Sequence, residues 1–259
     1  MNKKILTTYL KLCTEFYDLE LKDNQETQKA LEFYMGYALN AHGSILEPMC
    51  GTGRFLIPMI QAGCDVEGFD ASYYMLDALR QKYAILNTQE APVWQQFIQD
   101  FNNNKKYKLI FIPYGSWGLI RDRHDMLKSL KNMFEHLDSN GKFLIEIETV
   151  ASAPTEHGIW RRGVHRRDKT SQIAVNTLTS YNNETQIFTS ICRYELLIDG
   201  VITITETEDF QQYLYRYDEL DTILHDIGFS QVKKYKDFSK TPVTGNDNND
   251  PVLIYECIK

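Results

Sequence analysis

The stretch that decides the fold is Ser44-Ile45-Leu46-Glu47-Pro48-Met49-Cys50-Gly51-Thr52-Gly53-Arg54-Phe55-Leu56. It begins as an apolar run, passes through a short turn that contains Gly51 and Gly53, and reopens with apolar residues at helical spacing. This pattern predicts a strand that runs into a tight turn at the N-terminus of a helix. Glycine lets the backbone bend sharply there and lets a ligand lie against bare main chain. We therefore expect a ligand site outside the carboxyl end of this strand, as in open α/β sheets.

The residues around the turn argue against a dinucleotide fingerprint and for a different motif. The fingerprint G-x-G-x-x-G needs a third small residue, but the sixth position counted from Gly51 is Leu56. Glu47 precedes the turn, and a second predicted strand, residues 65–70, ends in Asp70. In these residues the chain resembles class I S-adenosylmethionine-dependent methyltransferases, whose first motif reads acidic-x-x-x-Gly-x-Gly, as residues 47–53 do here.

The resemblance implies an α/β fold with a Rossmann-like, seven-stranded, mostly parallel sheet and helices on both faces. Strands and helices alternate in the predicted pattern up to about residue 150, which is typical of such a sheet. The resemblance also implies S-adenosyl-L-methionine as the cofactor. The residues expected to contact it are Tyr17, Glu47, Pro48, Gly51, Thr52, Gly53, Arg54, Asp70, Ala71, Met75, Asp100, Phe101 and Pro113.

Two carboxylates are the main polar candidates for the adenosine part. Asp70 can accept hydrogen bonds from both ribose hydroxyls of a bound adenosine. It is not needed as a helix cap, because Ser72 already caps the predicted helix 73–84. In the resembled family the third strand ends in a carboxylate for the adenine amino group and an apolar neighbour, which Asp100 and Phe101 match. The alternative for Asp100 is an ordinary turn aspartate.

Ahead of the first strand, residues 1–43 predict a helical lid over the ligand site. Apolar residues at helical spacing indicate one helix over 3–20, and Asp23 with Glu26 suggests a capping box for a second helix that stops near Gly43. The triplet 16–18 resembles the Tyr-Asp of many small-molecule methyltransferases. Tyr17 therefore either touches the methionine end of the donor or packs the lid onto the core.

Two further segments complete the predicted organisation. Residues 44–150 and 215–259 form the cofactor-binding core, and residues 151–214 form an inserted antiparallel β-arm that covers the acceptor or makes a dimer contact. Long alternating runs joined by residues 182–184 and by Asp199-Gly200 are hairpin signals. The basic run 160–167 either binds an anionic acceptor or is the solvated face of a hairpin.

Composition limits the classes of protein that the chain can belong to. It has 259 residues, with 43% hydrophobic and 24% charged residues, as in an ordinary globular protein. No apolar run approaches the roughly 18 residues of a membrane span, and the first residues do not resemble a signal peptide, so we expect no membrane partner and a cytoplasmic location. The formal net charge of −7 argues against a nucleic acid as the main partner. The five cysteines lack metal-ligand spacing, so we expect reduced thiols and no metal site.

The loop after the fourth predicted strand, residues 113–118, is the second organising point. Aromatic faces stabilise a sulfonium cation, so Tyr114 and Trp117 could form the wall beside the methyl group or part of the acceptor pocket. The alternative is a strand-to-helix loop with core aromatics. Trp160 and Arg162, in the basic run of the arm, are the other candidates for the acceptor pocket.

Methyl transfer requires alignment more than a catalytic dyad. The reaction is an in-line displacement, in which a neutral amine can attack directly. If the acceptor must first lose a proton, the candidate bases are His157, His165, Glu146 and Glu148, and Tyr114 is a further catalytic candidate.

The predicted function is therefore methylation of a small-molecule acceptor, with an amine suggested by the resemblance. One alternative of the same fold methylates RNA or protein. Residues 113–116, Pro-Tyr-Gly-Ser, differ from the Asn-Pro-Pro-Tyr type of tetrapeptide, which counts against methylation of nucleic-acid bases. A non-catalytic protein that binds the nucleoside cofactor is a second alternative. A nicotinamide-dependent oxidoreductase is a third, and Leu56 counts against it.

Overall fold

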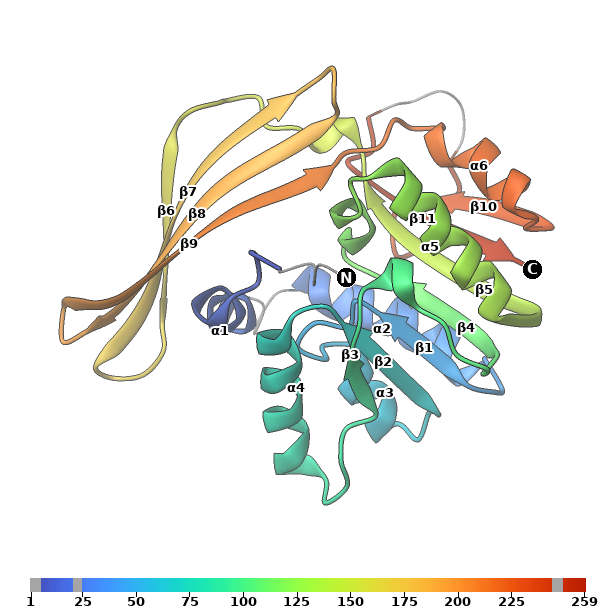
Figure 1. Cartoon of the computed structure of the whole chain (residues 1–259), viewed down its shortest axis with the longest axis horizontal. Coiled ribbons are helices and arrows are strands. Elements are labelled where there is room, and N and C mark those ends of the chain that lie inside the picture. Colours follow the sequence, from blue (N-terminus) through green and yellow to red (C-terminus); the bar gives the residue numbers. More distant parts are fainter. Residues whose placement is uncertain (1–5, 21–24, 244–248) are drawn as a thin grey trace.

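The computed structural model describes residues 6–20, 25–243 and 249–259. Its strands form a central sheet and a separate antiparallel sheet (Figure 1). Within these residues the central sheet has seven strands in the order β10-β11-β5-β4-β1-β2-β3. Their bounds are β1 Ile45–Pro48, β2 Val66–Asp70, β3 Val93–Gln95, β4 Tyr107–Ile112, β5 Leu137–Glu148, β10 Gln231–Tyr235 and β11 Val252–Ile258. Strands β1 to β5 pair in parallel, and β11 pairs antiparallel with both β5 and β10.

Helices cover both faces of this sheet because its inner strands are apolar on both faces. On one face Leu46, Ile110 and Ile145 pack with α5 (Arg123–His136) and α6 (Glu219–Ile227). On the other face Ile45 and Leu109 pack with α2 (Gln25–Leu39), α3 (Leu56–Gln61) and α4 (Tyr73–Leu86). Three short 3₁₀ turns, η1 Ile98–Asp100, η2 Ser116–Leu119 and η3 Val150–Ser152, follow β3, β4 and β5. The predicted fold class is confirmed.

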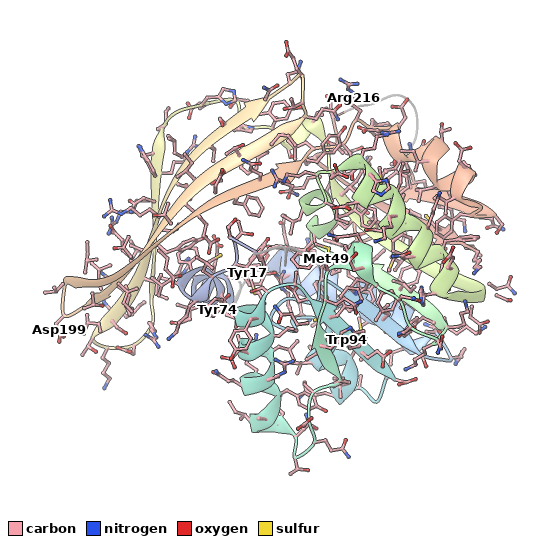
Figure 2. The ribbon with its side chains drawn as sticks, in the orientation of Figure 1. Tyr17, Met49, Tyr74, Trp94, Asp199 and Arg216 are labelled. Atoms are coloured by element: carbon pink, nitrogen blue, oxygen red, sulfur yellow. The ribbon has the colours of Figure 1, made fainter. Side chains whose placement is uncertain are left out.

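The second sheet forms an arm beside the core (Figure 1). Its strands are β6 Trp160–Arg166, β7 Ser171–Asn182, β8 Ile187–Ile198 and β9 Val201–Tyr213, paired antiparallel in that order. Asp199 (φ +50°) and Gly200 (φ +80°) form the two-residue turn between β8 and β9, as the Asp-Gly signal predicts. Asp199 lies at the far tip of the arm, and Arg216 lies where the arm joins the core (Figure 2).

Helix α1 (Lys11–Glu20) fills the space under the arm. Its Leu12 and Phe16 pack against Ile173 and Tyr194 of the arm. The predicted helix over 3–20 is wrong for residues 6–10, which form a non-helical segment that we call the strap. The helix begins only at Lys11, where two carboxylates of β9 bind N–H groups on both sides of its first residue. Glu208 accepts from Tyr9 (3.0 Å) and Leu10 (2.7 Å), and Glu206 accepts from Leu12 (2.7 Å).

Other element boundaries also differ between the prediction and the structure. Asp23 and residues 3–5 lie outside the described residues. Helix α2 ends at Leu39, before Gly43. The predicted third strand, residues 92–98, is ordered as a strand only over Val93–Gln95, where it pairs with β2 at the sheet edge. Among the described residues, no helix is both long and apolar enough to cross a membrane.

Candidate functional site

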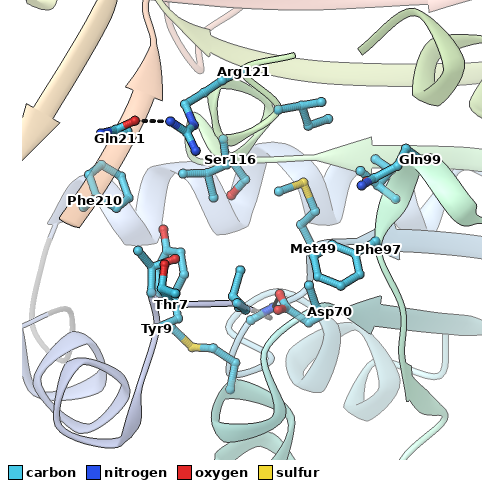
Figure 3. Close-up of a pocket in the computed structure, with 18 of the residues that line it drawn as sticks. Thr7, Tyr9, Met49, Asp70, Phe97, Gln99, Ser116, Arg121, Phe210 and Gln211 are labelled. Carbon is cyan, nitrogen blue, oxygen red and sulfur yellow. Dashed lines mark hydrogen bonds between the residues drawn. The ribbon is translucent and has the colours of Figure 1, made fainter. Parts of the chain in front are cut away.

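A cavity of about 380 Å³ lies beyond the carboxyl ends of the central strands (Figure 3). We call it the central cavity. One wall is the core, from the turn after β1, the end of β2 and the loops after β3 and β4. The opposite wall comes from the strap and from the end of β9. The cavity is therefore where the glycine turn predicts a ligand, at the crevice of an open α/β sheet.

The turn after β1 has a left-handed backbone at both glycines, but these serve different ends. Gly51 (φ +53°) lines the central cavity, and a Cβ atom added there would meet only the sulfur of Met75, at 4.0 Å. Gly53 (φ +81°) does not line it, and a Cβ there would lie 2.7 Å from Cγ of Leu79. Gly51 thus keeps the main chain open toward the cavity, whereas Gly53 allows α4 to pack against the turn. Pro48 closes β1 and likewise does not line the cavity.

Asp70 lies at the end of β2 and lines the cavity together with Ala71 and Met75. Its two carboxylate oxygens accept from the N–H of Gly51 (2.9 Å) and of Ser72 (2.8 Å). Burial raises the pKa of this carboxyl group, and these backbone bonds oppose the rise. A carboxylate oxygen can accept more than one hydrogen bond, so both oxygens retain capacity for the hydroxyls of a ligand. Ser72 caps α4 as predicted, accepting from Met75 at 3.2 Å.

Arg54 is held between two aromatic rings at the cavity wall. Its guanidinium carbon lies 3.9 Å from the ring centre of Tyr114 and 5.0 Å from that of Tyr17, and it donates a hydrogen bond to the Tyr17 hydroxyl. Both tyrosines line the central cavity. Burial raises the pKa of Tyr17, and the charge of Arg54 opposes this. The alternatives for Tyr17, ligand contact or packing of the lid, are therefore both compatible with its position.

Next to these rings, two buried polar atoms of opposite character have no hydrogen-bond partner among the described residues. They are Nη1 of Arg54 and Oε2 of Glu47. Glu47 is 1% exposed, so burial raises the pKa of its carboxyl group, while the charge of Arg54 lowers it. Buried polar groups are normally hydrogen-bonded. Neither residue lines the central cavity, but the two interact electrostatically. A buried donor and a buried acceptor without partners fit a zwitterionic ligand group, such as the amino-acid end of S-adenosylmethionine.

Thr52 anchors the lid rather than lining the cavity. Its hydroxyl donates to Asp18 of α1 (2.6 Å), and Lys82 of α4 pairs with the same carboxylate at 2.9 Å. The adjacent residues Tyr17 and Asp18 therefore have different contacts. Tyr17 lines the cavity, and Asp18 binds α1 to the glycine turn.

Asp100 and Phe101, predicted to contact adenine, are not at the cavity. The η1 turn points Asp100 toward α5, where its 60% exposed side chain pairs with Lys128 at 3.0 Å. Phe101 is 1% exposed and stacks on Phe69, with ring centres 4.9 Å apart. The cavity is lined here by the preceding residues 96–99 (Figure 3). The sequence gives no glycine or proline to mark this turn, so the strand was expected to continue past it.

The acceptor residues predicted from the sequence are mostly elsewhere. Tyr114 lines the cavity, but Trp117 is fully buried and packs against Phe143 in the core. Trp160 is 55% exposed on β6, and Arg162 of the same strand pairs with Glu195 at 3.5 Å. Neither lines the cavity, since β6 is the edge strand farthest from β9 in the arm. Pro113, the remaining predicted cofactor residue of this loop, is buried and does not line it either.

Sequence reasoning missed several residues of the cavity wall that faces the core. They include Tyr9 of the strap and Phe210 and Gln211 of β9. Arg121, which follows η2, donates a hydrogen bond to the side chain of Gln211 at the edge of the cavity (Figure 3). Alternation within β9 predicts a strand, but it does not reveal which end approaches the core.

None of the four candidate bases lines the central cavity. Glu146 is 5% exposed beneath the loop after β4, accepts from the Tyr34 hydroxyl (3.0 Å), and has its pKa raised by burial to about 7. Burial also raises the pKa of Glu148, which accepts from Ser152 at 3.3 Å. His157 is exposed, and His165 packs against Phe16 under the arm. In the described part of the chain, no group of three or more His, Cys, Asp or Glu residues could hold a metal ion.

Comparison with known proteins gives one family. The family profile described as "Methyltransferase domain" matches residues 19–233. A Bacillus subtilis (strain 168) protein, "Putative methyltransferase YqeM", is 26% identical over 113 residues, which are 43% of this chain and 45% of that protein. The chain thus matches less than half of the length of this relative.

Two solved structures show the same fold over almost the whole chain. An S-adenosylmethionine-dependent methyltransferase from Clostridium acetobutylicum ATCC 824 has a TM-score of 0.76 and 17% identity, with 94% of this chain and 96% of that chain covered. The sugar N-methyltransferase KedS8 from Streptoalloteichus sp ATCC 53650 has a TM-score of 0.71 and 15% identity, with 92% and 91% covered.

Proposed function

Because the chain belongs to the methyltransferase domain family, we propose that it transfers a methyl group from S-adenosyl-L-methionine to an amine nitrogen of a small molecule in the central cavity. The observation that carries the proposal is the donor site itself. Asp70 at the end of β2 lines the cavity beside the open turn at Gly51, and the unpaired buried atoms of Arg54 and Glu47 lie behind the cavity wall.

The lining residues fit the parts of the donor in order along the sheet edge. Asp70 would accept the ribose hydroxyls, and Phe97 and Ile98 would contact the adenine ring, with the amide of Gln99 available for its polar edge. At the other end, Arg54 and Glu47 lie behind the lining residues Tyr17 and Tyr114. There Arg54 would bind the carboxylate of the methionine part and Glu47 its ammonium group. For the adenine contacts, this assignment replaces the predicted Asp100 and Phe101 by residues 97–99. For the methionine part of the donor, it keeps the predicted Arg54 and Glu47.

The donor supplies a methyl group that is already activated on a sulfonium sulfur. The protein's residues then align and enclose the reactants. The rings of Tyr17 and Tyr114 hold the guanidinium of Arg54, and the strap and β9 exclude water from the opposite side of the cavity. A C–N bond forms as the C–S bond breaks, and the proton of the amine leaves to solvent. A neutral amine needs no base for the attack, which agrees with the absence of all four candidate bases from the cavity lining.

An amine acceptor is supported by the fold similarity to a sugar N-methyltransferase. A small acceptor is supported by the size of the cavity, about 380 Å³. The formal net charge of −7 weighs against RNA.

The test is a turnover assay. The full chain is incubated with S-adenosylmethionine and a panel of amino sugars, amino acids and simple amines, and products are read by mass spectrometry. We expect one or more amines to gain a methyl group, with S-adenosylhomocysteine formed in equal amount. If S-adenosylhomocysteine binds but no member of a broad panel is methylated, a non-catalytic cofactor-binding protein would be the better interpretation.

A further inference from the structure

The loop after β4 has a conformation that its own sequence does not favour. Tyr114 (φ +61°) and Gly115 (φ +65°) are consecutive left-handed residues. Glycine adopts this conformation freely, but for a tyrosine it is uncommon and costly. Such a residue keeps its geometry only where surrounding contacts fix it. The contacts around Tyr114 therefore decide where its ring stands in the cavity wall.

Two buried side chains bind the loop from beneath. The main-chain N–H of Tyr114 faces the carboxylate of Glu146 on β5 and lowers its pKa. Gln212 of β9 donates to the carbonyl of Gly115 at 3.1 Å. The ring of Tyr114 contacts Arg54 and Tyr17, whereas Glu146 faces the main chain of Tyr114, where the left-handed conformation is set.

Glu146 is itself held on the face of the sheet that α2 covers. The hydroxyl of Tyr34, a residue of α2 that is 0% exposed, donates to the carboxylate at 3.0 Å. Tyr34 in turn stacks on Phe111 of β4, with ring centres 5.3 Å apart. Glu146 thus receives one donor from the loop and one from a rigid aromatic cluster.

The charged and titratable groups that face Glu146 come from three elements besides its own. They are Tyr34 of α2, Arg54 of the turn after β1, and the loop at Tyr114, with Glu148 on the same strand. Glu47 of β1 faces Tyr34 and Arg54 in the same cluster. Because Glu146 does not line the cavity, it cannot take a proton from an acceptor bound there.

We propose that Glu146 is a positioning residue, which holds Tyr114 and through its ring the guanidinium of Arg54 at the donor end of the central cavity. The inference rests on the proposed function, since it concerns the binding of the same donor. Arg54 lies 3.9 Å from the Tyr114 ring centre, so a shift of the loop would move the face on which the guanidinium rests.

The positioning role has a pH signature. Two donors, the Tyr114 N–H and the Tyr34 O–H, point at this carboxylate and favour its ionised form. Burial raises the pKa from the usual 4.5 to about 7, so ionisation falls within an accessible pH range. We expect donor affinity to rise as the pH rises through about 7. Folding stability changes in the opposite direction, because a carboxyl group with a raised pKa stabilises the fold below its usual pKa and loses that contribution as the pH passes about 7.

The experiment is a calorimetric titration with S-adenosylhomocysteine between about pH 6 and 8.5. The wild type is compared with Glu146→Gln and with the matched control Glu256→Gln. Glu256 is also 5% exposed, and it accepts hydrogen bonds from two tyrosines, Tyr37 and Tyr235, but it lies on β11 and does not line the cavity. Circular dichroism melts confirm that each variant is folded.

We expect Glu146→Gln to bind about tenfold more weakly at the higher pH, the loss of one hydrogen bond to a charged group, and to lack the rise of affinity near pH 7. Glu256→Gln should keep both. Tyr34→Phe serves if Glu146→Gln does not fold. It removes a donor that lowers the pKa of Glu146, so the rise should move to higher pH.

The outcomes separate the two claims. If the wild type binds no S-adenosylhomocysteine at any pH, the proposed function fails. If the wild type binds it but Glu146→Gln has the same affinity and pH profile, or Tyr34→Phe leaves the midpoint unchanged, only the positioning role of Glu146 is overturned.

Discussion

Three glycines with left-handed backbone provide a test of the structure around the donor site. Gly51, Gly53 and Gly63 have φ values of +53°, +81° and +83°, so alanine at each position adds a similar backbone cost. Their surroundings differ. A Cβ on Gly63 meets nothing within 4 Å, one on Gly51 meets only Met75 at 4.0 Å, and one on Gly53 lies 2.7 Å from Leu79 Cγ and 3.1 Å from Ile57 Cδ1.

These distances give different magnitudes for the three alanine variants. Left-handed backbone costs a residue with a Cβ about 1–2 kcal/mol, and this is all that we expect Gly63→Ala to lose. Gly53→Ala adds overpacking against the fully buried Leu79, which typically costs about 1–3 kcal/mol more. Gly51→Ala should lose about as much unfolding free energy as Gly63→Ala does. Its methyl group, however, enters the side of the turn that lines the cavity, and should weaken S-adenosylhomocysteine binding at least tenfold, about 1.4 kcal/mol.

Urea unfolding followed by fluorescence and circular dichroism measures the first two effects, and agreement of the two probes checks that unfolding is two-state. Calorimetry measures the third. The reasoning would be refuted if Gly53→Ala were no less stable than Gly63→Ala, because helix α4 would then not pack closely on the turn at Gly53. It would also be refuted if Gly51→Ala bound the ligand as well as Gly63→Ala does.

Two further variants test the polar contacts of the site. Asp70→Asn should weaken S-adenosylhomocysteine binding by about 1.5–3 kcal/mol, the value of a hydrogen bond to a charged group. Asp77→Asn is the calorimetric control and should bind normally, because Asp77 of α4 accepts a hydrogen bond from the side chain of Gln81 and does not line the cavity. Glu208→Gln should loosen the strap, because Tyr9 and Leu10 lose a charged acceptor, and the amide of Leu10 should exchange with deuterium faster than in the wild type; unchanged exchange would show that the arm does not fix the strap.

The parts of the site that local chemistry determines could be predicted from the sequence. The turn with Gly51 and Gly53 follows from a strand, two glycines and a helical pattern within thirteen residues, 44–56. Asp70 follows from its place at the end of the next apolar strand. In both cases the residues that create the geometry are neighbours in the chain.

The remaining parts depend on contacts between distant segments. The start of α1 is set by Glu206 and Glu208, almost 200 residues away in the chain. Asp100 ends the η1 turn and its exposed side chain pairs with Lys128 of α5, and Trp117 faces the core rather than the acceptor. Phe210 and Gln211 reach the cavity only because the arm folds back over the strap. Residue patterns identify these segments as helices and strands, but they do not place them relative to one another.

The donor site is tested most directly by calorimetric titration of the full chain with S-adenosylhomocysteine, run beside an identical titration with NAD. We expect S-adenosylhomocysteine to bind with about micromolar affinity, near −8 kcal/mol, and NAD to give no binding heat at the same concentrations. Binding of NAD instead, or of neither compound, would contradict the assignment of residues 47–54 and Asp70 to the methyl donor.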